Sequence, residues 1–299
     1  MNILIIGSNG FIGSHCVSYF SEKGNYVYGC DVQTIKQPNY ISISQIQNDF
    51  KKLFEDKSFD FCINAAGSAN VAYSYHHPEK DFELNVSLVI NLLSAIKTFC
   101  PECKFINFSS AAVYGNPSKL PVREDSALMP LSPYGYHKML SEKLLLEYHH
   151  FFKLKTCSLR VFSAYGPGLK KQLFWDIYQK LCLKNTINLF GKGTETRDFI
   201  YISDLILALE CIMNNSLFKG EVINIATGTE TTINIATNYF IENFENKFKV
   251  VFNGIEKEGD PKNWKAEISS LEEMGFKQLI DLQTGLSKYA DWLKSNQQL

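Results

Sequence analysis

Apolar residues along the chain fall into two patterns that alternate. Short, nearly continuous apolar runs end at Gly, Asn or Ser, which predicts buried strands of a parallel sheet. Between these runs, apolar residues recur every three or four positions, which predicts amphipathic helices. Strands are expected at 2–6, 26–30, 59–64, 105–108 and 157–162, and the clearest helices at 83–99 and 134–152. The alternation predicts an α/β fold: a doubly wound parallel sheet with helices on both faces.

The pattern changes after Phe162. Turns that contain Gly and Pro follow, and the elements between them are short and mixed. The run 220–228 again looks like a buried strand that enters a glycine turn. We therefore predict a first domain over residues 1–165, to which the chain returns around 198–228, and a smaller mixed C-terminal lobe over 166–299.

Composition narrows the possible partners. The 299 residues are 45% hydrophobic, which is enough for a full-sized core. The 30 basic and 31 acidic side chains leave a formal net charge of -1, so no strong field attracts nucleic acid or an anionic membrane. The N-terminal apolar run is too short for a signal peptide, and no later run reaches about 18 apolar residues. We expect a soluble cytoplasmic protein.

Eight cysteines are scattered through apolar segments, which is typical of reduced thiols rather than of a disulfide framework. Cys100 and Cys103 form the one CxxC motif. This motif could be a redox pair, half of a zinc site, or a turn between a helix and a strand. No second CxxC or matching His pair accompanies it, so no metal site is predicted.

Three glycines follow the first predicted strand. Gly7, Gly10 and Gly13 form a GxxGxxG pattern that contains Phe11 and Ile12. Glycine permits a tight turn and a close approach of the backbone to a pyrophosphate, and the N-terminus of the following helix supplies free N–H groups. The pattern favours a dinucleotide site, but a glycine turn can also serve close packing alone.

Asp31 ends the second predicted strand, 18 residues after Gly13. A carboxylate at this position can accept hydrogen bonds from the ribose hydroxyls of a dinucleotide, and it repels a 2′-phosphate. No Arg or Lys follows Asp31 until Lys36. These features favour NAD over NADP.

Tyr134 and Lys138 stand four residues apart, and therefore on one face of a helix. A phenol with a pKa near 10 is a poor base at neutral pH. A neighbouring ammonium and an oxidised nicotinamide both favour the phenolate, which makes the pair a candidate for base catalysis. A Tyr–Lys pair on the surface would have the same spacing.

As a set, the motifs resemble the extended short-chain dehydrogenase/reductase family, and more narrowly its NAD-dependent nucleotide-sugar epimerase and dehydratase branch, of the UDP-glucose 4-epimerase type. Besides the glycines, Asp31 and the Tyr–Lys pair, the matching segments are Asn64-Ala-Ala-Gly67, Ser109-Ser110, Val113-Tyr-Gly115, Ser132-Pro-Tyr134, Arg160-Val-Phe-Ser-Ala-Tyr-Gly-Pro167, Phe190-Gly-Lys-Gly193, Arg197-Asp-Phe-Ile-Tyr201 and Gly259-Asp-Pro261. The resemblance covers nearly the whole chain. It implies a Rossmann-type NAD-binding domain over 1–165 and a substrate-binding lobe over 166–299.

The resemblance also implies roles for individual residues. Tyr134 is the base that removes a proton from a sugar hydroxyl, usually at C4, with Lys138 as its electrostatic partner and ribose anchor. Ser110 hydrogen-bonds the reacting sugar oxygen. The implied NAD contacts are Gly7, Gly10, Phe11, Ile12, Gly13, Asp31, Ala65, Ala66, Asn85, Ser109 and Lys138. The implied substrate contacts are Ser110, Tyr134, Ser163 and Arg197.

Ala111 and Ala112 decide between the reactions of this branch. In the dehydratases, the two positions after the serine or threonine carry an Asp-Glu pair that eliminates water across C5 and C6. Methyl groups can neither give nor take a proton, so dehydration is not expected. The 4-keto sugar then either takes the hydride back on its other face, as in a 4-epimerase that retains NAD, or is the substrate or product of a 4-keto reductase or 4-dehydrogenase that uses NAD(P)H from solution. Asp31 favours the epimerase. A non-catalytic dinucleotide sensor is a third hypothesis, but such proteins typically lose the Tyr or the Lys.

The predicted lobe departs from the family in several places. Ser163 replaces the Asn that usually contacts substrate phosphate, and the Gly-Asp pair that usually contacts adenine is not found around 40–44. Arg197 is the best candidate to bind the diphosphate, because its planar fork can hold two oxygens, although it could instead pair with Asp198 or Asp204. Residues 170–172 and Trp175 fall where the family contacts the nucleotide, without indicating UDP, GDP or dTDP.

Quaternary structure also follows from the resemblance. Two long helices per subunit form a four-helix interface in this family, and residues 81–99 and 134–152 match them. A homodimer is therefore expected. Sugar-nucleotide enzymes of this type commonly supply polysaccharide biosynthesis.

Overall fold

The molecule is organised around one large parallel sheet. The computed structural model describes residues 1–43, 50–55, 57–183, 186–245 and 248–296. Within these residues the sheet has seven strands in the order β10-β6-β5-β4-β1-β2-β3, and every neighbouring pair is parallel. The strands are β1 (Asn2–Ile6), β2 (Tyr26–Asp31), β3 (Tyr40–Ser42), β4 (Phe61–Asn64), β5 (Lys104–Ser110), β6 (Thr156–Val161) and β10 (Lys219–Ile225). The order reverses between β1 and β4, where parallel sheets of this kind bind ligands at the carboxyl ends of the strands.

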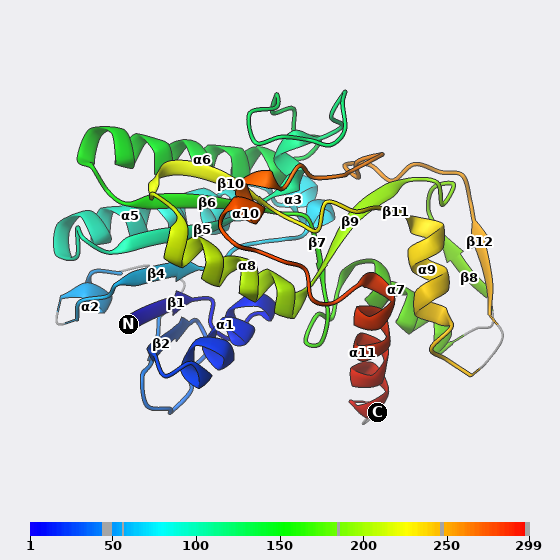
Figure 1. Ribbon diagram of the computed structural model, residues 1–299, viewed down its shortest axis with the longest axis horizontal. Helices are drawn as coiled ribbons and strands as arrows, with labels where there is room; N and C mark the ends of the chain where they lie inside the picture. The colour runs from blue at the N-terminus through cyan, green and yellow to red at the C-terminus, as the bar shows by residue number, and fades with distance from the viewer. Residues whose placement is uncertain (44–49, 56, 184–185, 246–247, 297–299) are drawn as a thin grey trace.

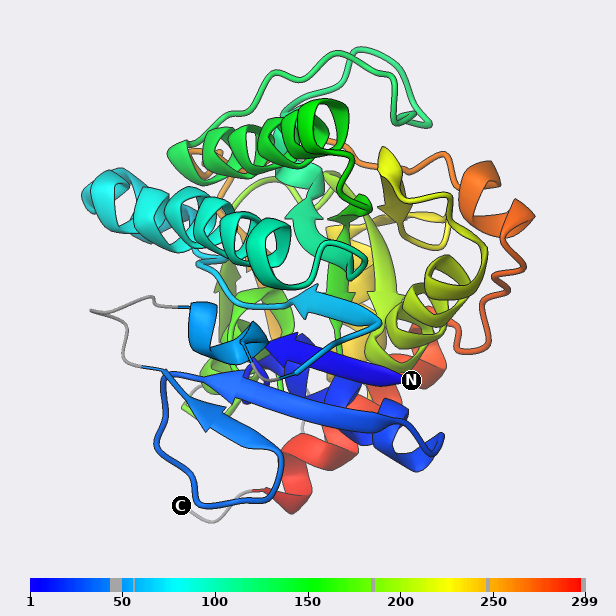
Figure 2. The same ribbon diagram turned by 90° about the vertical axis from the view of Figure 1, so that its left-hand side faces the viewer.

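Helices cover both faces of this sheet (Figures 1 and 2). Helices α1 (Phe11–Glu22) and α8 (Ile202–Asn215) pack on one face, where Cys16 and Phe20 join the larger hydrophobic cluster. Helices α2 (Lys51–Phe54), α5 (Leu88–Phe99) and α6 (Pro133–Phe152) cover the other face. Because both faces are covered, the central strands are buried along most of their length, as their nearly continuous apolar sequences predict.

The segment that precedes α5 is more elaborate than the single helix expected at 83–99. Helix α3 (Val71–His76) leads into α4 (Pro78–Phe82), a π-helical turn η1 (Glu83–Ser87) and then α5. By length and composition alone, the stretch Pro78–Phe99 could cross a membrane, and 39% of its apolar 18-residue window is buried inside the fold.

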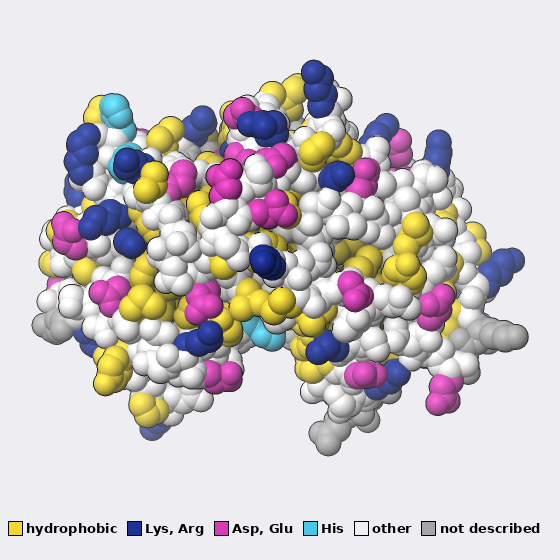
Figure 3. Space-filling view, viewed as in Figure 1, with side chains coloured by type: hydrophobic (Ala, Val, Ile, Leu, Met, Phe, Trp, Pro, Cys, Tyr) yellow, Lys and Arg dark blue, Asp and Glu magenta, His cyan; other side chains and the backbone are white. Residues whose placement is uncertain are grey.

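The second half of the chain adds two small sheets beyond the carboxyl ends of the large one. Strands β7 (Ser163–Tyr165), β9 (Thr196–Tyr201) and β11 (Glu230–Thr232) form a mixed sheet in the order β11-β9-β7. Strands β8 (Thr186–Leu189) and β12 (Lys249–Phe252) pair in parallel. The remaining helices are η2 (Ala111–Tyr114), α7 (Gln172–Leu181), α9 (Ile233–Ile241), α10 (Ser269–Glu273) and α11 (Leu282–Ser295). Figure 3 shows that the surface is hollowed between the part built on the large sheet and the part that carries α7, α9 and α11.

The predicted fold class is confirmed: the molecule has a Rossmann-type α/β fold with smaller mixed sheets. The chain returns to the large sheet through α8 and β10, whereas β9, at the start of the expected return, belongs to the mixed three-stranded sheet. The third strand is short, and residue 44, at the end of the segment where the family's Gly-Asp pair is missing, lies outside the described residues.

Candidate active site

The glycine turn between β1 and α1 packs too closely for side chains. Gly7 has a φ of +77°, and a Cβ on it would lie 2.6 Å from the backbone nitrogen of Ala66. A Cβ on Gly13 would lie 2.0 Å from the carbonyl oxygen of Gly7. Gly10 is the N-cap of α1, and no side chain caps this end. The turn thus presents bare backbone and the free N–H groups of a helix N-terminus beside the segment that contains Ala65.

Asp31 is fixed beside this turn at the end of β2. Its Oδ2 accepts a hydrogen bond of 2.9 Å from the backbone N–H of Asn9, and its Oδ1 accepts one of 2.7 Å from Val32. The Asn9 side chain donates to the hydroxyl of Tyr40 on β3 at 2.9 Å. Asn9 and Tyr40 therefore extend the predicted site.

Tyr134, Lys138 and Ser110 meet at the carboxyl edge of the sheet. Ser110 ends β5, and its side chain lies near the Tyr134 phenol, where it lowers the pKa of that phenol. Tyr134 lies in the first turn of α6, where its N–H donates to Ser74 at 3.1 Å. The Lys138 Nζ donates to the carbonyl oxygen of Phe108 at 2.9 Å and lies 5.9 Å from the centroid of the Tyr134 ring. The three residues that the resemblance names as catalytic form one cluster.

Burial controls the electrostatics of this cluster. Desolvation raises the pKa of Tyr134 to about 12, although the neighbouring Ser110 side chain partly opposes this shift. Desolvation lowers the pKa of Lys138 to about 8, and the Asp81 carboxylate partly restores it. The protein alone therefore keeps Tyr134 protonated at neutral pH, so a further positive charge is needed for the phenolate to act as a base.

Asn85 lies on the other side of Lys138, in the π-helical turn η1. Its Nδ2 donates to the Asp81 carbonyl at 3.1 Å, and its buried Oδ1 has no hydrogen-bond partner among the described residues. A Cβ on Gly67, whose φ is +134°, would lie 2.8 Å from that Oδ1 and 3.4 Å from Lys138 Nζ. Gly67 thus leaves space beside a buried acceptor, and π-helical turns often occur at functional sites.

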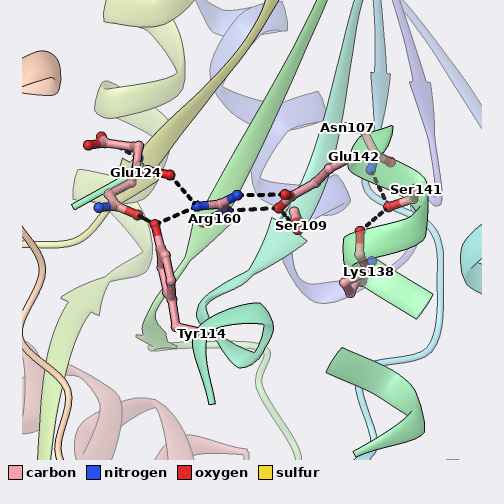
Figure 4. Close-up of polar contacts among 9 residues, drawn as sticks. Asn107, Ser109, Tyr114, Glu124, Lys138, Ser141, Glu142 and Arg160 are labelled. Carbon is pink, nitrogen blue, oxygen red and sulfur yellow. Dashed lines mark hydrogen bonds and ion pairs between the residues drawn. The ribbon is translucent and has the colours of Figure 1, made fainter. Parts of the chain in front are cut away.

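A buried ion pair between Glu142 and Arg160 clamps helix α6 to strand β6, and a hydrogen bond from Ser109 joins β5, the strand that carries Ser110, to the same carboxylate (Figure 4). Glu142 accepts a hydrogen bond of 2.6 Å from Ser109 and holds Arg160 through contacts of 3.0 and 2.7 Å. Arg160 also donates to the Tyr114 hydroxyl at 2.8 Å and to the Glu124 carbonyl at 2.9 Å. The Ser109 side chain is therefore engaged within the protein, and a contact of Ser109 with a cofactor would have to involve its backbone.

Ala111 and Ala112 form the start of η2, directly after Ser110. The N–H of Ala112 donates to the Ser110 Oγ at 3.2 Å. A Cβ on Gly135 would lie 2.7 Å from the carbonyl oxygen of Ala112, so glycine is required where α6 approaches this turn. The two positions place only methyl groups next to the catalytic cluster.

Arg197 and Ser163 lie on the neighbouring strands β9 and β7. The Arg197 Nη1 donates to the Thr196 carbonyl at 2.8 Å, and its guanidinium lies 5.5 Å from the centroid of the Trp264 ring. The alternative pairing of Arg197 does not occur. Asp198 accepts hydrogen bonds from Thr227 and Ala266, and Asp204 accepts them from the backbone of 279–280.

The CxxC cysteines lie at the opposite edge of the sheet, where Cys100 caps α5 and the N–H of Cys103 closes a turn onto its carbonyl at 2.9 Å. Among the described residues, no group of three or more His, Cys, Asp or Glu side chains is arranged to hold a metal ion.

A model of the NAD dependent epimerase/dehydratase family matches residues 3–226. The chain belongs to this family. It is 28% identical over 305 residues to a putative UDP-glucose 4-epimerase of Methanocaldococcus jannaschii, covering 98% of this chain and 99% of the relative. It is 27% identical to UDP-glucuronate 4-epimerase 3 of Arabidopsis thaliana, covering 97% of this chain and 76% of that protein.

Solved structures of epimerases share the fold over the full length. The UDP-glucuronic acid 4-epimerase from Bacillus cereus, in complex with UDP-glucuronic acid and NAD, has a TM-score of 0.88 at 28% identity and covers 99% of both chains. The UDP-N-acetylglucosamine 4-epimerase from Methanobrevibacter ruminantium M1, in complex with UDP-N-acetylmuramic acid, has a TM-score of 0.88 at 27% identity and covers 98% of both chains.

The residues of this epimerase-family chain fit NAD. The turn that contains Gly7, Gly10 and Gly13, here called the glycine cradle, has no side chains where a pyrophosphate would approach the helix N-terminus. Asp31 lies beside this cradle, where its carboxylate can accept hydrogen bonds from ribose hydroxyls. The unpartnered Oδ1 of Asn85 and the ammonium of Lys138 lie further along the same edge.

Sequence reasoning missed three parts of the site: the Asn9–Tyr40 contact, the Glu142–Arg160 clamp and a buried pair between Asp81 and His137. A signal existed for Glu142, which follows Tyr134 and Lys138 at the same four-residue spacing and therefore shares their helix face.

Proposed function

We propose that the protein is an NAD-dependent nucleotide-sugar 4-epimerase that acts through a transient 4-keto intermediate. The observation that carries the proposal is the cluster of Ser110 with the buried Tyr134 and Lys138 beside the glycine cradle, with methyl side chains at both positions that directly follow Ser110. The full-length similarity to UDP-sugar 4-epimerases supports it.

In the proposed reaction, the Tyr134 phenolate accepts the proton of the sugar 4-hydroxyl while the Ser110 hydroxyl hydrogen-bonds the same oxygen. Lys138 stabilises the phenolate electrostatically and, from its place beside Gly67, can reach a ribose hydroxyl. NAD, when bound, would supply the hydride acceptor and donor, and the 4-keto sugar would have to turn its other face toward it before the hydride returns. Tyr134 then gives the proton back to the oxygen of the epimer.

The residues around Ser110 argue against a dehydratase. Elimination of water needs an acid and a base near C5 and C6, and the positions that would supply them carry methyl groups. The remaining alternative, a 4-keto reductase or 4-dehydrogenase that exchanges NAD(P)H with solution, uses the same cluster. Asp31 beside the cradle favours a tightly held NAD and therefore the epimerase.

We propose that the two parts of the chain bind different molecules. Residues 1–165, completed by α8 and β10, hold the cofactor, and residues of 166–299 hold the nucleotide sugar. Arg197 on β9 and Ser163 on β7 contact the diphosphate side of the substrate, and the basic residues Lys170 and Lys171 precede α7 on the same side. The UDP-sugars bound by the relatives support a UDP-sugar.

We also infer a homodimer through α5 and α6. Ile90 on α5 and Leu146 on α6 are exposed, as is Phe82 at the end of α4, whereas Leu88 and Leu145 belong to the core. An exposed apolar surface of this kind is typical of a subunit interface. A role in polysaccharide biosynthesis in the cytoplasm would be consistent with a UDP-sugar substrate.

Purified protein should contain bound NAD and should interconvert a UDP-sugar with its C4 epimer when no cofactor is added. We would incubate it with UDP-glucose, UDP-glucuronic acid and UDP-N-acetylglucosamine and identify products by NMR. The Tyr134→Phe variant should keep its NAD and lose turnover. Stoichiometric reduction of NAD without a C4 epimer would contradict the epimerase and favour the dehydrogenase.

A further inference from the structure

His137 and Asp81 form a buried pair beside the catalytic cluster. His137 stands in α6 directly before Lys138, and its Nδ1 lies 2.7 Å from Oδ2 of Asp81 on α4. The Asp81 side chain is fully buried, and that of His137 is 11% exposed. The ring of Phe82 meets the imidazole edge to face at 5.4 Å between centroids and so restricts its orientation.

The second carboxylate oxygen of Asp81, Oδ1, makes no contact that explains why a carboxylate is buried here. Oδ1 is buried and has no hydrogen-bond partner among the described residues. A buried carboxylate oxygen without a partner destabilises the fold, so a carboxylate here has a cost that packing does not offset. Its charge acts on the active site, because Asp81 raises the pKa of Lys138 and also that of Tyr134.

The other charges around the catalytic residues are few. Glu142 on α6 also raises the pKa of Lys138, but less than Asp81 does, and it is already paired with Arg160. Lys171, just before α7, lowers the pKa of Lys138. The polar groups that α3, η1 and β5 contribute here are neutral: Ser74, Asn85 and Ser110.

We propose that Asp81, held in place by His137, is a positioning residue of the active site whose buried charge keeps the Lys138 ammonium protonated at neutral pH and sets the pH range in which Tyr134 and Lys138 act. This proposal rests on the proposed function for its catalytic readout.

The direction of the effect follows from the charges. A negative charge favours a protonated lysine and disfavours an ionised phenol, so Asp81 moves both pKa values upward. Without that charge, Tyr134 would ionise at lower pH and Lys138 would lose its proton at lower pH. The acid and alkaline limbs of the activity profile would then move together, which loss of packing alone would not produce.

The test is the pH profile of kcat for Asp81→Asn, which keeps the shape of the side chain and can still accept from His137. Both limbs should move to lower pH by about one unit. Glu83→Gln is the matched control, because it removes a solvent-exposed carboxylate from the adjoining turn, and its profile should coincide with that of the wild type. A reduced kcat with unmoved limbs in Asp81→Asn would overturn the proposal. If Asp81→Asn does not fold, Asp81→Ser removes the same charge in a smaller side chain and is read in the same way.

His137→Gln separates the carboxylate from its anchor, because the Gln amide can donate to Asp81 without carrying a charge. The acid and alkaline limbs of its kcat pH profile should stay within about 0.3 pH unit of those of the wild type, since the Asp81 carboxylate remains charged. If both limbs of the His137→Gln pH profile moved upward by as much as those of Asp81→Asn move downward, the proposal would be overturned. The pKa values of Tyr134 and Lys138 would then depend on a positive charge on His137 and not on the Asp81 carboxylate.

A second readout is independent of turnover. The phenolate absorbance of Tyr134, taken as the difference between each NAD-bound protein and its Tyr134→Phe counterpart, should appear at lower pH in Asp81→Asn than in the wild type. If no sugar is epimerised but this shift occurs, the proposed function fails while the charge effect stands. Coincident titrations would overturn the charge effect itself.

Discussion

Lys138 Nζ on α6 donates a hydrogen bond of 2.9 Å to the carbonyl oxygen of Phe108, two residues before the end of β5. The contact fixes the ammonium against the strand that carries Ser110, and so joins the two elements from which the catalytic cluster is built. Because the ammonium is buried there, it loses hydration, which lowers the pKa of Lys138 and destabilises the folded protein while the lysine is charged.

Replacing this ammonium should separate activity from stability. Lys138→Met should lower kcat by about 100-fold or more, since the phenolate loses its stabilising charge. A lysine whose folded pKa of about 8 lies below its unfolded value of 10.5 destabilises the protein while it is charged, and this cost disappears as the pH rises between those values. The variant should therefore be more stable than the wild type by about 1–3 kcal/mol near pH 7, with a smaller difference above pH 8. Chemical denaturation at several pH values measures this, and a variant less stable at every pH would contradict it.

Two glycines of the cradle should differ in their tolerance of a methyl group. Gly13→Ala would place a Cβ 2.0 Å from the Gly7 carbonyl oxygen, whereas in Gly10→Ala the same distance is 3.2 Å at an ordinary φ of -74°. We expect Gly13→Ala to lose bound NAD and about 1–3 kcal/mol of stability. Gly10→Ala is the matched control for folding and should keep the stability of the wild type, because its Cβ has more room within the protein. Equal unfolding free energies of the two variants would show that close packing of the turn is not what shapes the cradle.

The clamp that joins α6 to β6 and β5 should be sensitive to loss of one partner of its ion pair. Glu142→Ala leaves Arg160 buried without its carboxylate, which should cost about 3–5 kcal/mol of unfolding free energy. The exposed pair of Glu102 and Lys155 offers the control, and Glu102→Ala should leave the thermal midpoint unchanged. If both variants unfold at the wild-type temperature, the clamp does not hold these elements together.

Arg197 should affect substrate binding more than chemistry. Arg197→Met should raise KM for a UDP-sugar by about 10-fold to 100-fold while kcat changes less, because a diphosphate contact is made equally in the ground and transition states. Arg197→Lys should give an intermediate KM, since a point charge replaces the planar fork. Arg123→Met, which removes an exposed arginine from another loop, serves as the control. A fall in kcat at constant KM would contradict the assignment.

The sequence predicted the sheet because strands such as β1 and β4 are nearly continuous apolar runs, and both are buried as these runs imply. The four-residue spacing predicted that Tyr134 and Lys138 share a helix face, whereas the place of Ser110 beside them was implied by the family resemblance. The roles of Asp31, Ser163 and Arg197 stay predictions, and their positions are compatible with those roles.

The parts that sequence did not reveal depend on distant segments. His137 lies inside the YxxxK motif, but its partner Asp81 is 56 residues away, and no local pattern links them. The interruption of the expected helix at 83–99 by a π-helical turn also had no sequence signal, although it positions Asn85. Periodicity describes which face of an element is buried, and it does not identify the polar group opposite each buried side chain.

The central claim is that hydride leaves C4 of a sugar and returns to the same carbon. The most direct test uses UDP-glucuronic acid labelled with deuterium at C4, incubated with the purified protein without added cofactor and followed by NMR. We predict the C4 epimer with its deuterium retained at C4. Deuterium found in reduced cofactor without an epimer, or an epimer that has lost its label, would contradict the account.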